Sequence, residues 1–167
     1  MATTKQYLDP GAAIPHATNI PELVKIDGTN FPVFGYAFAD ATQDDQMSFR
    51  WKASNYGSGN VSVIIDWYSR SGSTTGAVVW GAALSVLTPG DAQSMETDGL
   101  ATENTQTTTV NGTARGLTRS TITVSNLDSL AADDSVEMRI RRLQSNGSDT
   151  MTGDAIIVGI EIQYSDT

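Results

Sequence analysis

Residues 47–68 read MSFRWKASNYGSGNVSVIIDWY, and this stretch decides the fold. In residues 47–53, apolar side chains alternate with polar ones, which is the period of a strand with one buried face. The same alternation returns in residues 61–67, after a glycine-rich segment. The pattern predicts a strand, a glycine-rich turn and a second strand, with Trp51 and Trp67 on the inward faces.

Similar patterns elsewhere predict further short strands joined by turns. Residues 77–87 are apolar on both faces, which places this strand centrally or under a partner chain. The pair Asn111-Gly112 is a strong hairpin signal, and the polar segment 92–104 is expected to cross between two sheets. The other expected strands cover residues 22–27, 31–39, 105–110, 118–124, 136–140 and 156–164. Together these features predict an all-β fold, a jelly-roll-like antiparallel β-sandwich.

The length of 167 residues suits one such domain. Residues 1–20 contain prolines and no sustained periodicity, so they predict an extended N-terminal arm. This arm is either disordered or ordered against a neighbouring subunit, and residues 21–167 form the single sandwich domain. The N-terminus lacks the apolar segment of a signal peptide, and no apolar run reaches the ~20 residues of a membrane span.

Composition excludes several classes of site. The chain has no cysteine, which excludes disulfides and thiolate metal sites. Its net charge of −9 makes it a poor candidate for binding DNA or RNA, whose phosphates attract Lys and Arg. The only basic cluster is Arg139, Arg141 and Arg142. A solvated strand face is favoured there over a phosphate site, because Glu137 shares the face of Arg139 and Arg141.

No catalytic, cofactor-binding or metal-ligating residue is predicted. His16 is the only histidine, and its proline-flanked position offers little to hold it near a nucleophile or base. Acidic residues cluster in loops, where they most often cap turns. A carboxylate-based glycosidase and a structural calcium site stay open as minor alternatives. The loop acids are Asp40, Asp44, Asp45, Asp133, Asp134, Asp149 and Asp154.

Exposed aromatic side chains could stack on sugar rings, as in carbohydrate-binding sandwiches. Tyr56 in the glycine-rich segment and Tyr68 at a strand end are the candidates, because Trp51, Trp67 and Trp80 fall on inward faces. A carbohydrate-binding or host-receptor-binding module that uses Tyr56 and the loop acids is therefore the alternative function.

Several segments, taken in order, resemble a group of small virion structural proteins of tailed bacteriophages. The resemblance covers about residues 31–164. It rests on Phe49–Asn60, the Trp67-Tyr68 strand, Val78–Gly81, Asp128–Asp134, Met138–Arg142 and Thr152–Ala155.

The resemblance implies a non-enzymatic jelly-roll protein that decorates a capsid or is another minor structural component. It would form a homo-oligomer, with a trimer favoured, bind major capsid or other virion proteins, and bind neither nucleic acid nor membrane. It would be made in the host cytoplasm and reside in the virion. The expected contact surface consists of Tyr7, Leu8, Ile14, His16, Tyr56, Gly57 and Gly59.

Overall fold

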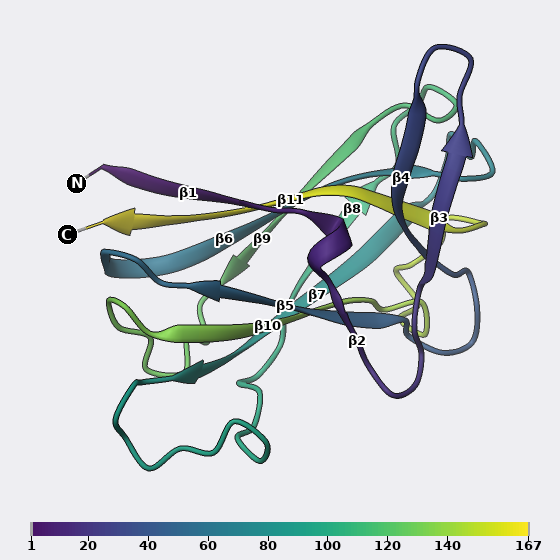
Figure 1. Ribbon diagram of the computed structural model, residues 1–167. Coiled ribbons are helices and arrows are strands. Elements are labelled where there is room, and N and C mark those ends of the chain that lie inside the picture. The colour runs from purple at the N-terminus through teal and green to yellow at the C-terminus, as the bar shows by residue number, and fades with distance from the viewer. Residues whose placement is uncertain (1, 167) are drawn as a thin grey trace.

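The computed structural model describes residues 2–166 and contains strands β1 to β11 (Figure 1). The one helical element in this range is the 3-10 turn η1, Pro10–Ala12, and no described helix is long and apolar enough to cross a membrane. The strands are β1 Thr3–Leu8, β2 Ile14–Pro15, β3 Glu22–Asp27, β4 Pro32–Phe38, β5 Gln46–Lys52, β6 Tyr56–Ser69, β7 Ala77–Leu87, β8 Asn104–Thr109, β9 Thr118–Val124, β10 Ser135–Arg142 and β11 Ala155–Asp166.

The strands form two antiparallel sheets that pack face to face. Sheet A has six strands, in the order β3-β4-β11-β6-β9, with β1 also paired to β11. Sheet B has five strands, in the order β2-β5-β10-β7-β8. This arrangement confirms the predicted jelly-roll-like antiparallel β-sandwich.

The hydrophobic core lies between the sheets. The Trp80 ring of sheet B lies edge-on to two rings of sheet A, 5.1 Å from Phe38 and 5.9 Å from Trp67 between centroids. The indole Nε1 of Trp67 donates to Ser120 Oγ at 2.8 Å, which satisfies a buried polar group. Trp51 is also buried, so the inward placement of all three tryptophans is confirmed.

The stretch at residues 47–68 forms its two strands, but the strands do not form a hairpin. β5 pairs with β10 and β2 in sheet B, whereas β6 pairs with β11 and β9 in sheet A. β6 begins at Tyr56, so most of the expected glycine-rich turn is strand. Each strand has one apolar face, and placing the strands in opposite sheets lets those faces bury each other.

The hairpin predicted at Asn111-Gly112 is also wrong, because β8 lies in sheet B and β9 in sheet A. The side chain of Asn111 holds a wider loop instead. Its Oδ1 accepts from Thr113 N at 2.8 Å, and its Nδ2 donates to Leu117 O at 2.9 Å. Asparagine bonds of this kind compete with a tight turn.

The N-terminal segment is extended and lies on the sandwich of its own chain. β1 pairs with β11 along residues 160–165, η1 follows, and β2 pairs with β5, so the segment passes from sheet A to sheet B (Figure 1). Gln6 Nε2 donates to Lys52 O at 2.7 Å and to Tyr164 Oη at 2.6 Å. These bonds connect both sheets, so the segment is ordered on its own chain.

β7 is a central strand, which is one of the two placements that its two apolar faces predicted. It lies between β10 and β8, and its outer-face residues Val79 and Ala83 are buried within the chain. The expectation that residues 92–104 cross between sheets is wrong. The loop 88–103 returns to sheet B and lies over it, with Ala101 N donating to Leu84 O at 2.7 Å. This loop shapes the site described below.

The basic cluster does not lie on one solvated strand face, as the sequence predicted. Arg139 and Arg141 lie on the outer face of β10 and pair with Glu103 at 3.4 and 2.7 Å. Arg142, however, points inward and is fully buried. Strand alternation explains the difference, because consecutive residues point to opposite faces of a sheet.

Candidate functional site

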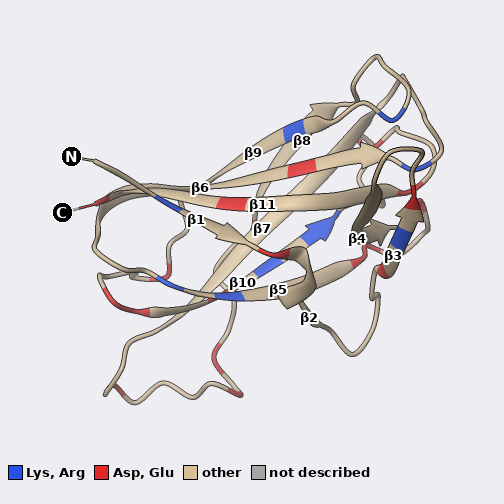
Figure 2. Cartoon of the chain, turned by 45° about the horizontal axis from the view of Figure 1, so that its top comes forward, with Lys and Arg blue, Asp and Glu red and all other residues tan. Residues whose placement is uncertain are grey.

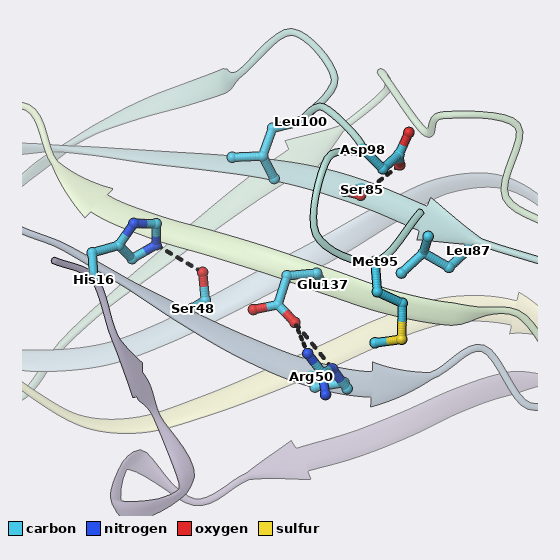
Figure 3. Close-up of a pocket in the computed structure, with 9 residues that line it drawn as sticks. All are labelled: His16, Ser48, Arg50, Ser85, Leu87, Met95, Asp98, Leu100 and Glu137. Atoms are coloured by element: carbon cyan, nitrogen blue, oxygen red, sulfur yellow. Dashed lines mark hydrogen bonds and ion pairs between the residues drawn. The ribbon is translucent and has the colours of Figure 1, made fainter. Parts of the chain in front are cut away.

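The outer face of sheet B carries a cleft of about 250 Å³, here called the sheet B cleft (Figure 3). Its floor comes from β5, β10 and β7, one wall from the loop 88–103, and the other from His16, just after β2. The lining residues are His16, Ser48, Arg50, Ser85, Leu87, Met95, Asp98, Leu100 and Glu137.

Strand alternation and register bring the polar floor together. Ser48 and Arg50 lie on the outer face of β5 because Met47, Phe49 and Trp51 fill the core. In the antiparallel register, Glu137 of β10 lies between Arg50 of β5 and Ser85 of β7. The ladder thus sets a cation, an anion and a hydroxyl in a row across three strands.

Arg50 and Glu137 form the centre of this row. The Nε and Nη2 atoms of Arg50 each lie 3.1 Å from Glu137 Oε2. The Arg50 side chain is 52% exposed and the Glu137 side chain 24%, so parts of both planar groups face the cleft. Planar guanidinium and carboxylate groups can bind pairs of polar atoms at once, which gives a ligand a defined orientation.

The loop 88–103 supplies both apolar and polar groups. Asp98 Oδ2 accepts from Ser85 Oγ at 2.8 Å, which ties the loop to β7. Met95 and Leu100 lie on this wall, with Leu87 at the end of β7 (Figure 3). A second hollow of about 220 Å³ shares Leu87 and Met95 and continues the groove along residues 88–93.

His16 closes the other side of the cleft. Its Nε2 lies 2.9 Å from Ser48 Oγ, so the expectation that little would hold His16 near a nucleophile or base is wrong. Partial burial and the nearby Arg139 charge lower the pKa of His16, while Glu137 opposes the shift. The imidazole is therefore neutral at pH 7 and can donate at one nitrogen and accept at the other.

The Ser48–His16 pair does not complete a hydrolytic triad. A serine nucleophile needs a histidine that a third group orients through its other nitrogen. Among residues 2–166, no carboxylate is hydrogen-bonded to His16. The two carboxylates of the cleft already bond to Arg50 and to Ser85. The arrangement suits binding through hydrogen bonds.

The loop acids hold backbone and side chains. Asp45 accepts from Ala39 N at 2.7 Å, and Asp40 accepts from Gly153 N at 2.8 Å. Asp134 accepts from Ala131 N at 2.8 Å. Within the described part of the chain, no three His, Cys, Asp or Glu side chains converge as metal ligands. Capping of turns accounts for these carboxylates.

The sequence-predicted contact residues are scattered in the structure. His16 lines the sheet B cleft, Ile14 is 42% exposed on β2, and Tyr7 is 69% exposed on β1. Leu8 is partly buried and packs against the core. Gly57 and Gly59 lie at the start of β6, in sheet A.

The expectation that Tyr56 and Tyr68 are exposed aromatic platforms is wrong. Tyr56 is 6% exposed, its ring lies 5.8 Å from Tyr164, and its hydroxyl donates to Gly59 O at 2.6 Å. Tyr68 is 8% exposed. The aromatic side chains that are exposed are Tyr7, Phe31 and Phe34. None of them lines the sheet B cleft.

Sequence reasoning missed most of the cleft. Alternation in the two strands placed Arg50 and Glu137 outward, and this alternation was the one signal in the sequence that pointed to the cleft. Asp98, Met95 and Leu100 were missed because the loop 88–103 has no periodic pattern to show that it folds back over sheet B.

Comparison with known proteins gives the fold but no sequence family. No protein-family model and no curated protein matches the chain. A carbohydrate-binding module, CBM28, specific for non-crystalline cellulose is similar in structure, with a TM-score of 0.52 and 10% identity over 92% of this chain and 89% of that one. A family 35 carbohydrate-binding module from Clostridium thermocellum has a TM-score of 0.50 and 14% identity over 95% of this chain and 97% of that one.

These structures overturn the resemblance to virion structural proteins of tailed bacteriophages. The similar folds are carbohydrate-binding modules, so the hypothesis of a capsid decoration protein is wrong. Two of the segments that carried the resemblance belong to the sandwich: Phe49–Asn60 spans the end of β5 and the start of β6, and Val78–Gly81 lies in β7. Alternating strands with Gly and Asn between them occur in many sandwiches and specify no function. The chain has the two-sheet β-sandwich fold that these carbohydrate-binding modules share.

Proposed function

We propose that this protein is a non-catalytic carbohydrate-binding module whose glycan lies in the sheet B cleft. The similar structures support the class of ligand, since one is named as specific for non-crystalline cellulose. The proposal keeps the alternative function expected from the sequence and moves its site from Tyr56 to the outer face of sheet B.

The observation that carries the proposal is the pairing of polar and apolar groups in one cleft. Sugars present adjacent hydroxyls that both donate and accept, together with C–H faces that are apolar. Arg50 donates, Glu137 accepts, and neutral His16 can do either. Leu87, Met95 and Leu100 offer the apolar surface. Binding sites with a few placed polar groups beside apolar walls are typical of small-molecule recognition.

The charges of the cleft favour a neutral ligand. Arg50 is paired with Glu137, and Asp98 adds a further negative charge. A phosphate-rich ligand would need an excess of Lys and Arg that this face does not provide. Figure 2 shows the basic residues of β5 and β10 along two adjacent strands and acidic residues mainly in the connecting loops. An uncharged oligosaccharide meets donors and acceptors there without a net charge penalty.

The shape of the groove favours a chain of sugars. The cleft and the second hollow measure about 250 and 220 Å³ and share Leu87 and Met95. Each is smaller than the ~300 Å³ at which drug-sized pockets begin. A glycan that extends over both hollows would contact several residues of the loop 88–103, because this loop lines both of them.

A glycan array followed by isothermal titration calorimetry tests the proposal. We expect binding to neutral polysaccharide fragments, with amorphous cellulose and cellohexaose as the first probes. Glu137→Ala removes a central acceptor and should weaken binding at least tenfold, the size of a charge-assisted hydrogen bond of ~1.5–3 kcal/mol.

Glu161→Ala is the matched control. Glu161 is also a strand carboxylate in an ion pair, with Lys5 at 3.4 Å, and its side chain is 27% exposed against 24% for Glu137. It lies in sheet A, so its loss should leave glycan affinity unchanged. An array without any glycan bound, or equal effects of the two substitutions, would refute the proposal.

A further inference from the structure

The outer face of sheet A carries a second, larger cleft that the proposed function does not use. This sheet A cleft measures about 440 Å³. Ile26, Val33 and Val158 form its apolar floor, and Phe31 and Leu117 are exposed on its walls. The walls come from the β3–β4 turn and the β8–β9 loop, which reach the same end of the sandwich (Figure 1).

Tyr68 gives this apolar cleft a polar group without a partner. The side chain is 8% exposed, lines the cleft, and packs in the cluster that contains Ile156 and Val158. Within residues 2–166 its hydroxyl makes no hydrogen bond to another protein group. Burial raises the pKa of Tyr68, so the hydroxyl is protonated and available as a donor. The hydroxyl oxygen is not fully buried, so it is accessible from the cleft and can donate to a ligand there.

Arg115 gives the same cleft an unpaired charge. The chain has ten Lys and Arg residues, all within the described range. Arg115 is the one among them that has no carboxylate within 4.0 Å. In a chain of net charge −9, a cation without an acidic neighbour is unusual. Its charge is close enough to Tyr68 to favour the ionised phenol.

The loop that carries Arg115 is held in place before any ligand binds. Arg115 has a left-handed backbone, with φ of 58°, and Gly116 N donates to Thr113 O at 2.8 Å. The Asn111 side chain bonds to Thr113 N and Leu117 O on both sides of it. A fixed loop lowers the entropic cost of ordering a binding site.

We propose that the sheet A cleft binds a small amphipathic carboxylate. Its apolar body covers the floor, and its carboxylate accepts from the Tyr68 hydroxyl and from the Arg115 guanidinium. The charge of Arg115 selects the anion over the neutral analogue, because hydrogen bonds to charged groups are the stronger ones. A cavity of this size suits a body of about ten heavy atoms. This inference does not depend on glycan binding to sheet B.

Calorimetry with two acids and their neutral analogues tests the inference. The acids are trans-cinnamate, with an aromatic body, and octanoate, with an aliphatic one. The neutral analogues are cinnamyl alcohol and octan-1-ol. We expect at least one acid to bind about tenfold more tightly than its alcohol, and the acid that binds tells whether the natural ligand is aromatic or aliphatic.

Two substitutions assign the contacts. Arg115→Gln and Tyr68→Phe should each weaken acid binding about tenfold and leave alcohol binding unchanged. Tyr68→Phe removes only a hydroxyl without a partner, so the fold should be retained. Lys5→Gln is the control, because it removes one positive charge outside the cleft. The inference is overturned if neither acid binds at millimolar concentration, if the acids bind no better than the alcohols, or if Arg115→Gln binds acid like the unchanged protein.

Discussion

Asp149→Asn should strongly destabilise the sandwich through its effect on the buried Arg142. The two side chains are 0% and 1% exposed, and two atom pairs join them, Nη2 to Oδ1 at 2.7 Å and Nε to Oδ2 at 3.1 Å. The remaining Arg142 hydrogens go to the carbonyls of Phe38, Met151 and Gly153. Every donor of this guanidinium is satisfied only while Asp149 is a carboxylate.

An asparagine would leave the guanidinium charge buried without a counterion. The amide nitrogen of the asparagine is a donor and would face other donors, either Arg142 alone or Arg142 and Val79 N, which donates to Asp149 Oδ2 at 3.0 Å. Breaking one partner of a buried ion pair costs ~3–5 kcal/mol, against a total stability of ~5–15 kcal/mol for a domain. Urea denaturation should therefore show a large drop in the midpoint. Arg50→Gln, which breaks a half-exposed pair, should cost below ~1 kcal/mol. The reasoning is refuted if Asp149→Asn costs as little as Arg50→Gln.

Three further predictions concern His16, the N-terminal strand and Gly81. The pKa of His16, measured by NMR, should lie below the ordinary value near 6.5. The free energy of unfolding should then fall as pH drops below 6.5, because the unfolded chain binds a proton before the folded one, and His16→Gln should flatten that fall. A His16 pKa at or above 6.5 would contradict this. Removing residues 1–8 should lower the urea midpoint, because β1 and Gln6 join both sheets; an unchanged midpoint would show that these contacts add nothing. Gly81→Ala should displace Glu103, whose carboxyl carbon would lie 2.5 Å from the new Cβ, and a crystal structure that retains the pairs of Glu103 with Arg139 and Arg141 would contradict it.

The strands could be predicted from the sequence because side-chain alternation is a local property. Trp67 and Trp80 fell on inward faces in the pattern and are buried in the structure. The pairing of strands could not be predicted in the same way. Residues 47–68 fit a hairpin and two strands of opposite sheets equally well, since both arrangements bury the same faces.

The candidate site could be predicted only in part. Arg50 and Glu137 were placed outward by alternation, but their contact depends on the β5–β10 register, which is long-range. The wall at Asp98 and Met95 depends on where an irregular loop folds back. Arg142 was expected on a solvated face because it belongs to a basic run, yet alternation turns it inward.

The measurement that tests the central claim most directly is an NMR titration of the labelled protein with a glycan found on the array. We predict that the amide signals of Ser48, Arg50, Glu137 and the loop 88–103 shift together and saturate with one affinity. Shifts confined to sheet A, or no shifts with any neutral glycan, would contradict the assignment of the sheet B cleft as a carbohydrate-binding site.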